Sequence, residues 1–159
     1  MNKSTIACIT AVIVSIGGVA ISDGHISDEQ IEAAVKARKA HMQLYSFNLA
    51  TLGGMAKEEI PYDAEAASAA ADNLVALSQV SQAGYWLPGS DSASVEGSRA
   101  LPAIWEAGSD IGQKGADFAA AALAMQAAAG TDLAALKAGM GGLGESCGGC
   151  HKPYRAPRN

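Results

Sequence analysis

Residues 133–154 read LAALKAGMGGLGESCGGCHKPY, and this stretch decides both the fold and the chemistry of the chain. It contains Cys147-Gly148-Gly149-Cys150-His151, whose thiols and imidazole share one helix face because residues at i, i+3 and i+4 are neighbours there. C-x-x-C-H is the attachment signal of c-type haem, with the thiols bonded to the porphyrin and the histidine to the iron. We therefore predict one covalent haem c on Cys147 and Cys150, with His151 as an axial ligand.

Two other uses of these side chains fit the sequence less well. A structural zinc ion takes four protein ligands, and the motif supplies three; the remaining cysteine, Cys8, lies in a segment that we expect to be removed. A redox dithiol lies at the start of a helix that follows a strand, whereas this pair lies near the end of a helical stretch. Haem attachment is the interpretation that also uses His151.

The N-terminus predicts export. Lys3 precedes an apolar run over residues 6–16, and Gly17-Gly18-Val19-Ala20 supplies the small residues that a signal peptidase reads. We expect residues 1–20 to be a cleaved signal peptide and residues 21–159 to form the mature domain in a bacterial periplasm. A retained anchor is the alternative, although the apolar run is shorter than the ~20 residues that span a bilayer.

The charge of the chain limits its partners. The formal net charge is −5 for 159 residues, and removal of Lys3 with the signal peptide makes it −6. An acidic surface argues against nucleic acid and against stable association with anionic membranes, and it leaves a cationic redox partner as an option. The length suits one domain with one core.

Four helices are predicted from hydrophobic periodicity. The first begins at Ser27, where Gln30 completes a capping box, and ends at Gly53-Gly54. The apolar stripe alternates steps of four and three residues. Its predicted members are Ile31, Val35, Arg38, Met42, Tyr45, Leu49 and Leu52.

The other three helices follow from their caps. Asp63 caps the second, which ends near Gly84, and a loop rich in Gly, Ser and Pro follows. Pro102 opens the third helix, and Asp132 caps the fourth. Stripes of average period 3.5 predict an all-α fold, an antiparallel left-handed four-helix bundle. The haem is expected in the bundle core near the C-terminal helix, because the haem motif continues the inner stripe.

Over residues 27–156 the chain resembles the cytochromes c′, the class II c-type cytochromes. The resemblance is carried by Arg38 with Met42 four residues later, by the segments from Trp86 to Gly89 and from Pro102 to Trp105, and by the haem motif followed by Tyr154 and Arg155. It implies a four-helix bundle with the haem near its C-terminus, and a homodimer paired through the first two helices.

Arg38 interrupts an inward stripe, and a guanidinium in a core needs an anionic partner. Haem brings two carboxylates, and the resemblance assigns this arginine to the propionate side. The alternative is that Arg38 reaches solvent from the edge of the bundle.

The resemblance places Met42 over the distal face of the haem as a bulky apolar residue, packed like the core. His41 lies about 100° off the stripe, and we expect it to be a solvated surface histidine. On the proximal side the resemblance implies Arg155 beside the iron ligand, with Tyr154 next to it. The alternative is that the positive charge of Arg155 only interacts favourably with the helix dipole. Pro153 removes a backbone donor just after His151, so the sequence does not determine the orientations of Tyr154 and Arg155.

The resemblance implies a five-coordinate iron that binds small uncharged gases, above all nitric oxide and also carbon monoxide. No histidine or methionine follows His151, so the downstream methionine of ordinary electron-carrying cytochromes c has no counterpart. The alternative function is a six-coordinate electron carrier in which Met42 or His41 completes the shell. We expect no enzymatic activity, because no distal histidine and arginine pair of peroxidase type can be recognised.

The attachment hypothesis has a direct test. Denatured mature protein should retain its haem, because thioether bonds survive loss of the fold, and the double variant Cys147→Ala, Cys150→Ala should lose it. The measurement is extraction with acidic organic solvent, followed by haem staining of the denatured chain. Extraction of haem from the unmutated protein would contradict covalent attachment.

Overall fold

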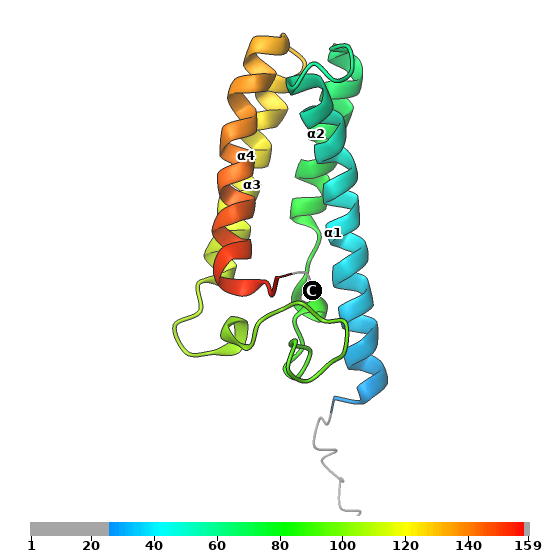
Figure 1. The fold of residues 1–159 in the computed structure, drawn as a ribbon, viewed down its shortest axis with the longest axis vertical. Coiled ribbons are helices and arrows are strands. Elements are labelled where there is room, and N and C mark those ends of the chain that lie inside the picture. The colour runs from blue at the N-terminus through cyan, green and yellow to red at the C-terminus, as the bar shows by residue number, and fades with distance from the viewer. Residues whose placement is uncertain (1–25, 158–159) are drawn as a thin grey trace, which may run out of the picture.

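The computed structural model describes residues 26–157, and within them the fold is four α-helices with two short 3-10 helices. Helices that follow one another in the sequence run in opposite directions (Figure 1). The expected all-α four-helix bundle is confirmed, and the predicted signal peptide lies outside the described residues. The helices are α1 (Asp28–Ala56), α2 (Ala64–Gln79), η1 (Ala83–Tyr85), η2 (Pro102–Trp105), α3 (Ile111–Ala129) and α4 (Leu133–Tyr154).

Three of the predicted helix starts are confirmed by their hydrogen bonds. At α1, Ser27 and Gln30 form the capping box in both directions, with N···O distances of 2.9 and 3.3 Å. The side chains of Asp63 and Asp132 accept hydrogen bonds from backbone N–H groups in the first turns of α2 and α4, at 2.9 and 2.8 Å. These caps satisfy donors that a helix start would otherwise leave unpaired.

Three predicted boundaries were wrong, and one of them is the end of α2, which lies at Gln79 and not near Gly84. α1 continues through Gly53 and Gly54, because Leu52 and Met55 are buried on its inner face and packing outweighs the poor helix propensity of glycine. The chain turns only after Lys57, where Glu58 has a positive φ of 62°. Pro102 opens only the short η2 rather than α3, since Gly108, with φ of 91°, separates η2 from α3.

The buried residues fall into two clusters. The larger fills the bundle between the four helices, and its fully buried large side chains are Leu52, Leu74, Met125, Leu136 and Leu143. Gly139 lets α4 approach α3, because a Cβ at this position would lie 2.9 Å from Cε of Met125. The smaller cluster joins Tyr154 at the end of α4 to Ala100 and Ile104 in the long loop. The haem motif of α4 therefore lies at the end of the bundle that the loop covers.

The buried stripe of α1 differs from the predicted one by one residue at two positions. His41 and Asn48 are buried, where Met42 and Leu49 were expected, although Leu49 is partly buried and packs against the larger cluster. Asn48 donates to the carbonyl of Leu44 at 2.8 Å and accepts from the Asn73 amide at 3.0 Å, and His41 has one hydrogen bond, with the backbone of Leu77. Buried polar groups are tolerated when they are hydrogen-bonded, so packing against α2 selected the polar residues.

None of the helices in residues 26–157 is long and apolar enough to cross a membrane.

Candidate functional site

The last turns of α4 bring together the three side chains of the haem motif. Cys147, Cys150 and His151 are all partly buried, and both cysteines are free thiols. Burial raises the pKa of both thiols. Burial lowers the pKa of His151, and the positive charges of Arg155 and Arg99 lower it further. The neutral imidazole is the form that binds a metal, so this donor set fits a covalent haem with His151 on the iron.

Tyr45 connects α1 to this turn of α4. Its ring packs edge-on against Phe118 of α3, with the ring centroids 4.6 Å apart. Burial is the main cause that raises the pKa of Tyr45 to about 12, and the nearby Cys147 thiol acts in the same direction, while a hydrogen bond with Gln82 opposes it. Cys147 therefore lies near the inner face of α1.

The prediction that His41 is a solvated surface residue was wrong. Its side chain is 5% exposed, and its ring lies edge-on to Tyr45 with the centroids 4.6 Å apart and 5.7 Å from the ring of Tyr85. Burial lowers its pKa, and a hydrogen bond with the backbone of Leu77 at the end of α2 opposes this shift. Nε2 is buried without a hydrogen-bond partner among the residues of the described chain. His41 thus belongs to the contact of α1 with α2 and η1.

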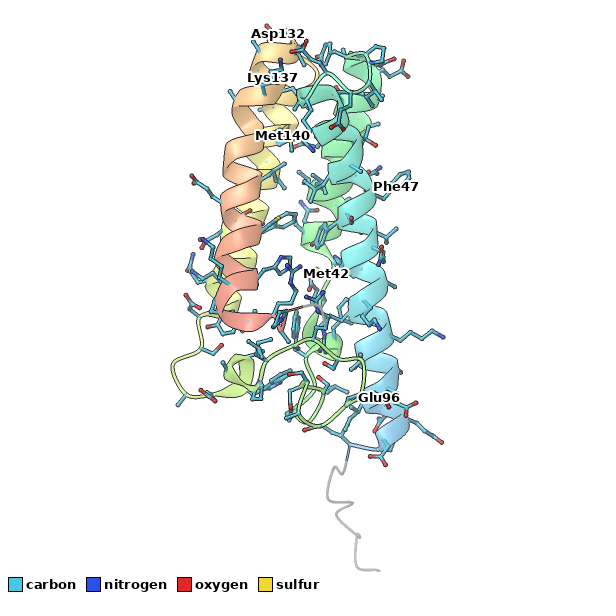
Figure 2. The ribbon with its side chains drawn as sticks, viewed as in Figure 1. Met42, Phe47, Glu96, Asp132, Lys137 and Met140 are labelled. Atoms are coloured by element: carbon cyan, nitrogen blue, oxygen red, sulfur yellow. The ribbon has the colours of Figure 1, made fainter. Side chains whose placement is uncertain are left out.

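The expected core packing of Met42 was also wrong, because 36% of this residue is exposed. It lies on the side of α1 that faces α4, whereas Phe47 points away from the bundle (Figure 2). The one-residue shift of the buried stripe explains the exposure: His41 fills the contact with α2, and Met42, 100° further round the helix, lies beside that contact. The thioether is therefore not held by the packed core.

Arg38 is buried, and its partners are in the long loop. Nη1 donates to the carbonyl of Tyr85 at 2.8 Å and to the hydroxyl of Ser90 at 3.1 Å. Nη2 donates to the carbonyl of Ser90 at 2.9 Å and to the hydroxyl of Ser98 at 3.1 Å. The carbon at the centre of the guanidinium lies 4.7 Å from the ring centroid of Trp86. With 6% exposure, the alternative in which Arg38 reaches solvent is excluded.

The loop is shaped to receive this guanidinium. The N–H of Ser90 donates to the carbonyl of Leu87 at 3.1 Å, and Gly89 has φ of 81°. Proline followed by a residue with positive φ is the pattern of a type II turn, so Pro88-Gly89 turns the chain and directs Ser90 inward. Sequence reasoning expected an anionic partner for Arg38; the structure provides neutral oxygens from this turn and from Ser98.

Tyr154 and Arg155 separate at the end of α4. Tyr154 is buried in the smaller cluster, and its hydroxyl donates to the Asp110 carboxylate at 2.6 Å and accepts from the Asp110 N–H at 2.9 Å. Arg155 is exposed and has left the helix, with extended backbone angles of −125° and 123°. Pro153 in the preceding turn is consistent with this early exit. After burial, the positive charge of Arg155 is the next cause that lowers the pKa of His151.

Three contributors to the site were missed in the sequence. Ser90 and Ser98 are buried as acceptors of the Arg38 hydrogen bonds, and Arg99 lies close enough to His151 to lower its pKa. The available signal was the Pro88-Gly89 pair. It predicts a turn before Ser90, but it does not predict that Ser90 contacts α1.

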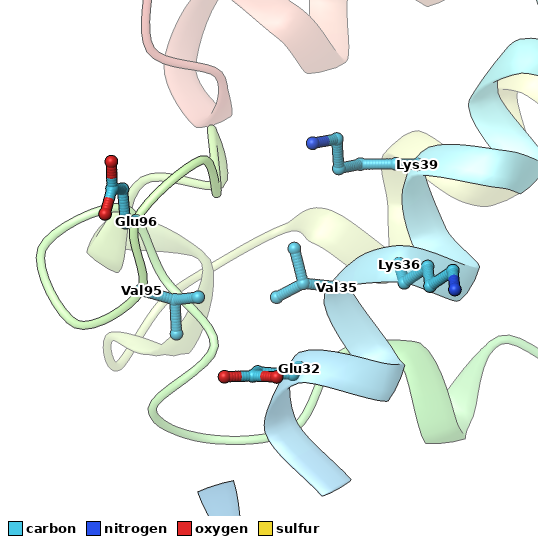
Figure 3. Close-up of a pocket in the computed structure, with 6 residues that line it drawn as sticks. All are labelled: Glu32, Val35, Lys36, Lys39, Val95 and Glu96. Atoms are coloured by element: carbon cyan, nitrogen blue, oxygen red, sulfur yellow. The ribbon is translucent and has the colours of Figure 1, made fainter. Parts of the chain in front are cut away.

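A surface hollow of about 190 Å³ lies between the start of α1 and the loop (Figure 3). It carries both signs of charge, and it contains none of the predicted haem residues. Its lining residues are Glu32, Val35, Lys36, Lys39, Val95 and Glu96.

Comparison with known proteins points to one family. The family model described as Cytochrome C' matches residues 33–155. Cytochrome c-554 from Cereibacter sphaeroides is 52% identical over 126 residues, which cover 79% of this chain and 95% of that protein.

Solved structures agree with the sequence matches. Cytochrome c' from Rhodobacter Spheriodes superposes with a TM-score of 0.78 at 37% identity, over 80% of this chain and 98% of that one. A mutant of cytochrome c prime from Alcaligenes xylosoxidans, solved as its nitric oxide complex, gives a TM-score of 0.69 at 31% identity, over 80% and 97%.

The four hydrogen bonds of Arg38 generate a stability prediction. Arg38→Lys keeps the charge but offers three donors on one nitrogen, which cannot reach the oxygens of Tyr85, Ser90 and Ser98 together. We expect the free energy of unfolding of the holoprotein to fall by about 2–4 kcal/mol, measured by urea unfolding. Backbone amides of residues 90–98 should also exchange faster with deuterium.

Lys39→Gln is the matched control, because this exposed lysine lies one residue further along α1. We expect a change within about 0.5 kcal/mol for it, as for most surface substitutions. Equal effects of the two substitutions would contradict a stabilising role of the Arg38 hydrogen bonds.

Proposed function

Because the chain belongs to the cytochrome c′ family, a family of non-enzymatic haem proteins, we propose that it is a periplasmic electron carrier with one covalent haem c. Cys147 and Cys150 attach the porphyrin, and His151 is an axial ligand of the iron. The support is local: the three donors lie on one face of α4, both thiols are free, and burial keeps the imidazole neutral at ordinary pH. When bound, the haem supplies one-electron chemistry, and the chain supplies its position and its charge environment.

The observation that carries the carrier proposal is the position of Met42. We propose that its thioether is the sixth ligand, since it lies on the side of α1 that faces α4 and the packed core does not hold it. A flexible, unbranched side chain can adjust its sulfur to a metal at little cost. Methionine opposite histidine raises the reduction potential of a c-type haem, which suits an electron carrier.

His41 is the weaker candidate for this position. Its ring lies between Tyr45 and Tyr85, and a hydrogen bond with Leu77 ties it to α2. To reach a group held by α4, the imidazole would have to leave both ring contacts. We therefore assign His41 to packing and not to the iron.

The second candidate function is the five-coordinate binding of nitric oxide and carbon monoxide. It is favoured by the solved nitric oxide complex of a family member and by the partial exposure of Met42, which is compatible with a residue that covers the distal face without ligating. The two candidates differ in a single bond to Met42.

The remaining residues have supporting roles in this proposal. Arg38 lies one turn before Met42, where its positive charge would favour the propionates of a bound haem, and its hydrogen bonds hold the loop. Tyr154 anchors the end of α4 to Asp110, and Arg155 adds positive charge on the proximal side. An acidic mature chain of net charge −6 suits a cationic redox partner.

Dimer formation belongs to the same proposal. Leu44 and Phe47 lie three residues apart on α1, are 52% and 71% exposed, and form an apolar stripe suited to a second copy of the chain. The double substitution Leu44→Ser, Phe47→Ser should convert a dimer to a monomer, measured by sedimentation equilibrium. A monomeric unmutated holoprotein would refute this part.

The coordination proposal is tested by absorption and electron paramagnetic resonance spectra of the oxidised holoprotein. We expect a low-spin iron that becomes high-spin in Met42→Ala and in Met42→Leu. Met42→Leu is the sharper variant, because it keeps an apolar side chain of similar size and removes only the sulfur. Its reduction potential should fall, since the thioether stabilises the reduced state.

His41→Ala is the control and should leave the spin state unchanged. A high-spin iron in the unmutated protein, with carbon monoxide binding accelerated by Met42→Ala, would refute the electron-carrier proposal and support five-coordinate gas binding. A spin change in His41→Ala alone would assign the sixth ligand to the imidazole and refute Met42.

A further inference from the structure

The chain segment directly after the haem motif is held by loop residues 99–101, and Arg99 makes the largest number of these hydrogen bonds. Ala100 and Arg155 form an antiparallel bridge, and the N–H of Leu101 donates to the carbonyl of Tyr154 at 2.9 Å. The N–H of Ala156 donates to the carbonyl of Arg99 at 2.8 Å. The Arg99 side chain then contacts the same residue, because Nε and Nη2 donate to the carbonyl of Ala156 at 3.0 and 2.5 Å. Arg99 thus binds residue 156 through both its backbone and its guanidinium.

This attachment matters because the end of α4 is weak on its own. Pro153 lies in the last turn and has no N–H to donate, and the final backbone bond of the helix runs from Arg155 to the carbonyl of His151 at 3.1 Å. A helix end that lacks donors frays unless another element holds it. The orientation of His151 therefore depends on where the following residues are fixed, and the segment 99–101 fixes them.

The guanidinium of Arg99 also contributes charge to the proximal side. Burial is the first cause of the low pKa of His151, and the positive charges of Arg155 and Arg99 add to it. The two arginines differ in their surroundings: Arg155 is exposed, whereas Arg99 is partly buried and tied to Ala156. Salt screens exposed charges far more than partly buried ones.

We propose that Arg99 is a positioning residue of the proximal side, which fastens the segment after His151 and keeps a positive charge beside that imidazole, and so raises the reduction potential of the haem. A positive charge favours the reduced iron because reduction removes one positive charge from the centre. The inference rests on the proposed function only in taking His151 as an axial ligand, and it holds whether or not Met42 ligates.

The test is a redox titration of the holoprotein for Arg99→Gln, Arg99→Lys and Arg155→Gln, at low salt and in 1 M sodium chloride. At a fixed potential, we expect Arg99→Gln to raise the ratio of oxidised to reduced protein by roughly threefold or more at both salt concentrations. Arg155→Gln should raise the ratio only at low salt. Arg99→Lys should restore most of the ratio, because the charge returns.

Deuterium exchange of the amides of residues 154–156 measures the fastening separately. We expect faster exchange in Arg99→Gln and in Arg99→Lys, since neither side chain can reproduce the two donors, and unchanged exchange in Arg155→Gln, whose side chain has no part in the tether. If Arg99→Gln yields no holoprotein, Arg99→Lys still tests the tether.

An unchanged ratio in Arg99→Gln, no recovery in Arg99→Lys, or unchanged exchange of residues 154–156 in Arg99→Lys would overturn the proposal. A failure of the proposed function is distinguishable, because loss of covalent haem or of histidine ligation would appear in the unmutated protein.

Discussion

The burial of one guanidinium organises the end of the bundle where the haem motif lies. A charge in a protein interior is tolerated only when its hydrogen-bonding capacity is satisfied, and Arg38 meets this condition with four bonds to Tyr85, Ser90 and Ser98. These bonds bind two distant parts of the loop to α1. Ser98 is held in this way, and the next residue, Arg99, holds the segment after His151. A continuous set of contacts therefore leads from α1 through the loop to the segment that follows His151.

This arrangement gives the loop a structural part in the site. Without the Pro88-Gly89 turn, Ser90 would not be directed at α1, and without Ser90 and Ser98 the guanidinium would be a buried charge with unpaired donors. Trp86 packs over the same guanidinium, and its carbonyl accepts a hydrogen bond from the indole N–H of Trp105 at 3.0 Å. The loop is thus packed as a second small core, which covers the end of α4.

On the inner face of α1, two polar residues form part of the contact with α2. His41 and Asn48 replace apolar neighbours in the contact with α2, because Leu77 and Asn73 offer them partners. The consequence for function is indirect but large. With His41 in that contact, Met42 is left on the side toward α4, partly exposed, and free of the packing that holds a core methionine. Hydrogen bonds between α1 and α2 bury His41, and this leaves Met42 as the side chain of α1 that is available near the haem motif.

Local chemistry explains what could be predicted from the sequence alone. The haem motif depends only on the spacing of residues within one helical turn. The caps at Ser27, Asp63 and Asp132 depend only on residues three positions further along the chain. Both features could therefore be predicted without any tertiary contact. The four-helix architecture followed from the same periodicity. The errors concern features that depend on residues far apart in the chain: the inward turn of His41, the extension of α1 through Gly53 and Gly54, and the partners of Arg38. Hydrophobicity ranks Met42 above His41 as a core residue, and only the presence of an acceptor on α2 reverses that order. Tertiary structure decided these points because a buried polar group is stable only where its partner lies, and no local pattern records that position.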